Sequence, residues 1–139
     1  MFLFKLNKKE KEVFCKLANY VACVDGIAKE EIELLDQYNL EMGTQYKFET
    51  NCKYSIEELT QQLSSSTLEA RKIIAFELIG LANSDSDYSS NEIQAVTQIC
   101  FALKVDPNTQ KEMENLVEKL MSLYHEVAEL IKVNEANGN

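Results

Sequence analysis

Arginine is almost absent from this chain of 139 residues, and basic side chains are outnumbered. Of the 14 basic residues thirteen are lysine and only Arg71 is arginine, while 23 acids bring the net charge to −9. Residues 73–103 contain no lysine or arginine at all. Because nucleic-acid readers rely on arginine forks and basic stripes, this balance argues against a nucleic-acid partner. A cation or a basic protein surface fits it better.

Histidine and paired cysteines are also lacking. His125 is the single histidine, and the four cysteines show no Cys-x-x-Cys spacing, which argues against a zinc site. Cys15 and Cys23 lie about 12 Å apart if they share one helix, too far for a disulfide. We therefore expect four reduced, mostly buried thiols and a cytoplasmic location.

Membrane segments and catalytic motifs are missing from the sequence as well. No apolar run approaches the roughly 20 residues that span a bilayer, and the apolar start at residues 1–4 is too short for a signal-peptide core. The chain has no Ser/His/Asp set, no glycine-rich phosphate loop and no cysteine beside a base. We expect neither stable membrane insertion nor an enzyme.

Apolar residues recur at helical spacing, and strand-like alternation is almost absent. Capping boxes or variants mark four helix starts, and a cap followed by proline marks a fifth: Asn7…Glu10, Ser55…Glu58, Ser66…Glu69, Ser89…Glu92 and Asp106-Pro107. Residues 44–54 are predicted to form a loop with aromatic anchors. The sequence predicts an all-α, single-domain bundle of about six to seven helices over residues 1–134, with a disordered tail at 135–139.

Three of the expected helices carry specific predictions. Ile32, Leu35, Tyr38 and Met42 should form the apolar face of a helix over 29–42. The segment 73–82 is apolar nearly all round and should be the buried central helix, with Gly80 at a close helix crossing. Glu77 is its only charge and should lie on a thin solvated strip, the alternative being that it reaches the acidic site. The last helix is long, and its apolar stripe comprises Met113, Leu116, Leu120, Leu123, Val127 and Leu130 or Ile131.

One feature occurs twice in the chain. An apolar helical run ends in Val24-Asp25-Gly26, and the next helix opens with Glu30-Glu31-Ile32. Sixty residues later, Ser84-Asp85-Ser86 ends another apolar run and Asn91-Glu92-Ile93 opens the next helix. The match predicts a duplicated helix–acidic loop–helix unit with an internal pseudo-twofold axis. Two such loops brought together would form a negatively charged, oxygen-rich site.

The second acidic loop offers oxygen atoms at alternate positions, from Asp85 and Asp87 to Ser89. It begins like a calcium loop but departs from the EF-hand pattern, because Ser90 replaces the turn glycine and Val96 replaces the bidentate glutamate. Glu92 enters early instead. Carboxylate and hydroxyl oxygens without histidine or cysteine indicate a hard cation: calcium, magnesium or manganese. The candidate metal ligands are Asp25, Glu31, Asp85, Asp87 and Glu92.

A purely structural interpretation stands beside this one. Asp25-Gly26 is also an ordinary helix stop and turn, and Glu92 also closes a capping box with Ser89. Acids in a first helical turn are favoured by the macrodipole. The repetition favours function, since a turn needs no glutamate at a fixed offset and Glu31 has no Ser or Thr three residues before it.

At these motifs the chain resembles the tellurite-resistance TerB-like family. The resemblance covers roughly residues 5–105, with Asp25, Gly26 and Glu31 matching the first motif and Asp85 and Glu92 the second. It implies an all-helical bundle with clustered acids that bind metal, and a link to tellurite, metal or stress response. Ser86 departs from the family's glycine, and the first loop is one residue shorter than the second.

Two functions follow from the sequence, and both are non-enzymatic. The first is a divalent-cation module that uses the five acids of the paired loops. The alternative is an adaptor domain whose acidic surface recognises a basic protein partner.

Overall fold

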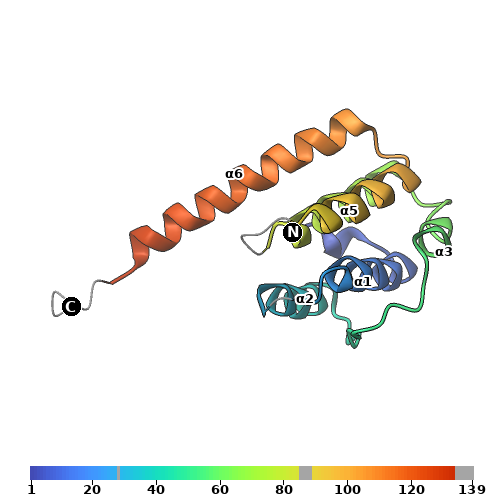
Figure 1. Ribbon diagram of the computed structural model, residues 1–139, viewed down its shortest axis with the longest axis horizontal. Coiled ribbons are helices and arrows are strands. Elements are labelled where there is room, and N and C mark those ends of the chain that lie inside the picture. The colour runs from blue at the N-terminus through green and yellow to red at the C-terminus, as the bar shows by residue number, and fades with distance from the viewer. Residues whose placement is uncertain (28, 85–88, 134–139) are drawn as a thin grey trace.

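The computed structural model describes residues 1–27, 29–84 and 89–133, and within them the chain is all-helical, with six α-helices and no strand. The prediction of an all-α fold is thereby confirmed. A short 3-10 turn precedes the helices, and the elements are η1 (Leu3–Lys5), α1 (Lys8–Cys23), α2 (Lys29–Met42), α3 (Ile56–Gln61), α4 (Leu68–Ala82), α5 (Ser90–Ala102) and α6 (Pro107–Ile131). Figure 1 shows α6 crossing one side of the other helices.

Most helices begin where the capping residues predict. At the start of α1, the Asn7 side chain accepts from the Glu10 amide and the Glu10 carboxylate accepts from the Asn7 amide, which completes the capping box. Ser55, Ser89 and Asp106 cap α3, α5 and α6. The start of α4 was predicted one residue too early, because the Thr67 hydroxyl, and not that of Ser66, accepts from the Ala70 amide.

Helix α4 is the centre of the bundle and contacts η1, α1, α5 and α6. Its apolar side chains face neighbours on several sides, and Ile74, Leu78 and Leu81 are all fully buried. The prediction that this segment is the buried central helix is confirmed. Since α1 packs on α4 and α4 packs on α5, the helices that precede and follow the two acidic loops belong to one core.

Glu77 on α4 does not lie on a solvated strip, as the sequence suggested. It is 7% exposed, and its carboxylate forms an ion pair with the Met1 amine, which also pairs with Glu41. Burial lowers the pKa of that amine, but the hydrogen bonds and charges of Glu77 and Glu41 outweigh burial and raise it. A charge on a buried helix thus has a partner that only the tertiary fold brings to it.

Gly80 on α4 does not mark a close helix crossing, contrary to expectation. A Cβ atom built at this position would meet nothing within 4 Å. Lys104, two residues after the end of α5, has a left-handed backbone conformation with a φ of 59°. There the Val105 amide donates to the Cys100 carbonyl at 2.9 Å and the Lys104 amide donates to Phe101 at 3.0 Å, a Schellman motif without its usual glycine.

Residues 44–54 form a loop, as predicted, and α1 holds it in place. The buried Asn19 side chain donates to the Glu49 carbonyl at 3.1 Å and accepts from the Glu49 amide at 2.7 Å. The rings of Tyr46 and Phe48 meet edge to face and pack against the core. The loop therefore runs along the side of α1 without forming a strand.

Helix α6 packs on α4 and α5 through its first half only. Gln110 and Val117 are its buried residues, whereas every position from 121 to 131 is exposed. In Figure 1 the C-terminal half of α6 extends past the other helices. Within the described residues, no helix has both the length and the apolar character needed to cross a bilayer.

Candidate functional site

The first acidic turn follows directly from the end of α1. The helix ends at Cys23, and Asp25 lies in the turn with its carboxylate in solvent. Gly26 then adopts a φ of +84°, a conformation that residues with a Cβ rarely adopt. The glycine therefore turns the chain toward α2 and leaves the Asp25 carboxylate at the surface.

This turn meets the start of α5, which belongs to the second motif. The Asn91 side-chain amide donates to Asp25 Oδ1 at 2.8 Å, across 66 residues of sequence. Hydrogen bonds from Ser89 and then from Asn91 lower the pKa of the Asp25 carboxyl group. The two motifs thus meet at a polar contact between the first turn and the N-terminus of α5.

The two motif glutamates are buried at equivalent positions. Glu31 in the first turn of α2 is 1% exposed, and Glu92 in the first turn of α5 is 3% exposed. Ile32, expected on the buried face of α2, is instead 49% exposed. That prediction is wrong because α2 turns Glu31, together with Leu35 and Tyr38, toward the interior.

Cys23, the last residue of α1, is close enough to Glu31 for the charge of that carboxylate to affect its thiol. Burial first, and then the charges of Cys52 and Glu31, raise the pKa of the Cys23 thiol. Cys23 therefore stays a thiol, and it donates to the Glu49 carbonyl at 3.0 Å.

The other two predicted ligands, Asp85 and Asp87, lie outside the described residues. Within the described ranges 1–27, 29–84 and 89–133, no group of three or more His, Cys, Asp or Glu side chains is placed to hold a metal ion. Of the five predicted metal ligands, the structure describes three: Asp25 and Glu31 in the first motif and Glu92 in the second. The internal twofold axis stays a prediction.

Sequence reasoning did not identify Asn91 and Ser89 as partners of Asp25. Ser89 was assigned to the cap of the helix and to the oxygen atoms of the second acidic loop, and it does cap α5 by accepting from the Glu92 amide at 3.1 Å. Asn91 occupies the position that Glu30 holds in the first motif. The difference between Asn91 and Glu30 could have indicated this contact from the sequence, since an amide donor complements a facing carboxylate whereas a second carboxylate repels it.

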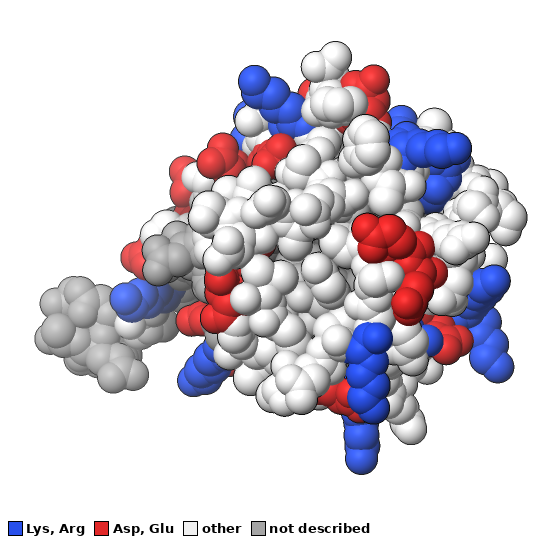
Figure 2. All heavy atoms as spheres, turned by 45° about the vertical axis from the view of Figure 1, so that its right-hand side comes forward, with Lys and Arg blue, Asp and Glu red and all other residues white. Residues whose placement is uncertain are grey.

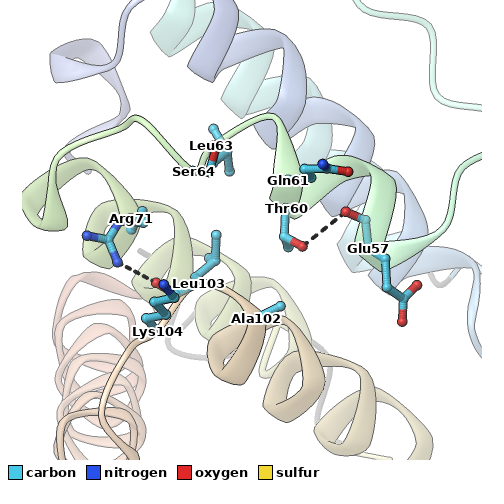
Figure 3. A pocket seen from close by; sticks show the side chains of 9 residues that line it. All are labelled: Glu57, Thr60, Gln61, Leu63, Ser64, Arg71, Ala102, Leu103 and Lys104. Atoms are coloured by element: carbon cyan, nitrogen blue, oxygen red, sulfur yellow. Dashed lines mark hydrogen bonds between the residues drawn. The ribbon is translucent and has the colours of Figure 1, made fainter.

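A separate hollow of about 360 Å³ lies at the opposite end of α5 (Figure 3). Residues of α3, α4 and the α5 C-terminus line it, including Glu57, Arg71 and Lys104. Arg71 is engaged in structure there, since it donates to the Leu103 carbonyl at 2.7 Å and to the Ser66 carbonyl at 3.3 Å. The hollow is not part of the acidic site.

Charges of both signs occur on the face in Figure 2, where they surround a largely uncharged centre. That face offers no continuous acidic surface of the kind that an adaptor for a basic protein would use.

The chain matches no protein-family model, and neither a curated protein nor a solved structure matches it.

Proposed function

We propose that this chain is a non-enzymatic, TerB-like binding module that takes up a divalent cation where its two acidic motifs meet. The observation that carries the proposal is the 2.8 Å hydrogen bond from Asn91 to Asp25. It brings the first acidic turn to the start of α5, directly beside the second acidic loop in sequence. Acids from two distant segments can then contribute to one site.

The paired glutamates support this proposal. Burying a carboxyl group costs free energy unless the group gains a partner. In both motifs the glutamate is buried, while Ile32 in the first motif is half exposed. Two buried carboxyl groups at matching positions of the two motifs support a cation-binding role.

The charge pattern of the second motif adds a further argument. Residues 73–103 contain no lysine or arginine, so the clustered carboxylates of this motif repel one another without a basic side chain from the same segment to offset them. A hard cation relieves such repulsion, and oxygen ligands at alternate positions from Asp85 onward suit it. Asp25, Glu31, Asp85, Asp87 and Glu92 are the proposed ligands for calcium, magnesium or manganese.

The biological setting belongs to the same proposal. The resemblance to the TerB-like family implies a role in the response to tellurite, metals or stress. Cys15, Cys23, Cys52 and Cys100 are all thiols, which fits a reducing cytoplasm.

A thermal-unfolding series tests the cation function. Calcium, magnesium or manganese should stabilise the fold by RT ln(1 + [L]/Kd), or ~2.7 kcal/mol at a hundredfold excess over Kd, and so raise the melting temperature. Asp85→Asn with Asp87→Asn should raise the metal-free melting temperature by easing repulsion, and should abolish the response. The matched control, Asp36→Asn with Glu129→Gln, makes the same change in net charge on exposed side chains and should keep the response.

A wild-type melting temperature that none of the three cations moves at millimolar concentration would reject the cation module. The adaptor for a basic protein partner would then replace it.

A further inference from the structure

The second half of α6 carries large apolar side chains that nothing in the described residues covers. These are Met121, Leu123, Tyr124, Val127, Leu130 and Ile131, with exposed fractions between 44% and 85%. Helical segments this short are marginal in water without packing, and apolar patches this dense mark interaction surfaces. The free half of α6 is therefore expected to pack against another helix.

The spacing of the stripe shows which kind of helix pairing it suits. Met113, Leu116, Leu120, Leu123, Val127 and Leu130 are separated alternately by three and four residues. This is the a/d pattern of a coiled coil, with a period of 3.5 residues. We call these six residues the α6 seam.

Met113 at the start of the α6 seam packs against the core, but from Leu116 onward the bundle leaves one flank of the seam accessible. Val117, on one side of the seam, is 4% exposed and packs on the bundle, whereas Leu116 is 52% exposed. Glu112 and Lys119, on the other side, are exposed. A second helix can lie along this outer flank without displacing α4 or α5.

We propose that the α6 seam binds the α6 seam of a second copy of this chain, as an antiparallel pair around a twofold axis. In this register Leu120 packs against Leu123 of the partner subunit, and Leu116 packs against Val127 of the partner subunit. Each layer then joins an a position to a d position, as antiparallel coiled coils require. The interface is isologous, so it closes at two copies.

Charge complementarity selects the antiparallel orientation. Lys119 and Glu126 occupy the same heptad position, g, one residue before Leu120 and Val127. Antiparallel pairing brings g positions together, so Lys119 meets Glu126 of the partner subunit and the contact occurs twice. Parallel pairing would set g against e, where Val117, Tyr124 and Ile131 offer no charge. The proposal is independent of the cation site.

Sedimentation equilibrium of the full chain tests the pairing. Wild type should have a mass about twice the 15.9 kDa of one chain at tens of micromolar. Leu123→Lys with Val127→Lys should give a monomer that retains its helical circular dichroism, because both side chains lie outside the core. A monomeric wild type, or a dimer that survives this double substitution, would overturn the proposal, as would a monomer that binds lipid vesicles through the seam.

Charge reversal tests the orientation. Lys119→Glu or Glu126→Lys alone should weaken dimerisation about tenfold by opposing like charges, and the two together should restore it. Glu118→Lys, the control, makes the same charge change as Glu126→Lys but lies on the face away from the seam, and should leave the dimer unchanged. Single reversals without effect, or a double variant that stays weak, would reject the antiparallel arrangement.

Discussion

Asn91 donates a 2.8 Å hydrogen bond to Asp25, a residue 66 positions earlier in the sequence. The contact joins the turn after α1 to the first turn of α5. The contact lies at the surface, and the packing of α1 against α5 brings its two ends together. It fixes the first acidic turn against the start of α5. The proposed cation site depends on this juxtaposition.

Removing the Asn91 amide should shift the titration of Asp25. Hydrogen bonds from Ser89 and Asn91 lower the pKa of this carboxyl group, so in Asn91→Ala the pKa should rise toward its usual range. A depressed folded-state pKa gives stability that is present above the unfolded pKa and lost as pH falls through the folded pKa. The variant should thus be less stable than wild type at neutral pH, with the difference vanishing in acid.

Urea unfolding at neutral and acidic pH, together with a nuclear magnetic resonance titration of Asp25, measures both effects. Asn51→Ala in the exposed loop is the control and should change neither. A stability deficit in Asn91→Ala that is the same at both pH values would show that the amide acts through something other than the Asp25 charge.

Leu78→Asp should prevent folding. Leu78 is 0% exposed on the central helix, and an unpaired buried charge costs several kcal/mol against a total stability of about 5–15 kcal/mol. Leu68→Asp is the matched control, since that side chain is 45% exposed in the first turn of the same helix. Circular dichroism should show a native control and an unfolded Leu78 variant; native melting by both would mean that α4 is not central.

Gly80→Ala should stabilise the protein by about 0.4–1 kcal/mol. The position is helical and a Cβ there meets nothing within 4 Å, so alanine adds helix propensity without a clash. Chemical denaturation measures the gain as a higher midpoint at unchanged slope. A loss of stability would indicate that Gly80 contacts a partner absent from the single chain.

Lys104→Gly should also stabilise the protein, for the opposite reason. Lys104 holds a φ of 59° in the Schellman motif after α5, and glycine takes this conformation without the penalty of a Cβ. A gain of about 1 kcal/mol in the free energy of unfolding is expected. The exposed Lys53→Gly substitution is the control and should bring no such gain.

The sequence predicted the all-α fold because capping residues and helical periodicity are local signals. Asn7, Ser55 and Asp106 mark their helices through contacts within the next three residues. The partner of Glu77 was not predictable in this way, since the Met1 amine lies 76 residues away in sequence. Local sequence patterns therefore predict the helices, whereas polar pairs between distant residues can be identified only once the tertiary fold is known.

In the candidate site, too, some residues were predictable from the sequence and others were not. Asp25, Glu31 and Glu92 were selected by the repetition of the motif, by the chemistry of their carboxylates and by the family resemblance, and the structure buries both glutamates. The role of Asn91 was not predicted, because its hydrogen bond to Asp25 joins two segments that only the tertiary fold brings together. Ile32 was misassigned because apolar periodicity favours burying isoleucine, whereas α2 buries the adjacent glutamate.

Manganese-induced broadening of backbone amide signals tests the central claim most directly. Substoichiometric Mn²⁺ should broaden the amides of Asp25, Glu31, Asn91 and Glu92 together, because one ion lies near both motifs, and excess Mg²⁺ should restore them. Acids on the exposed face of α6, such as Glu118 and Glu129, should stay sharp at the same ratio. Broadening that is absent, confined to one motif, or spread over all surface acids would contradict a shared cation site.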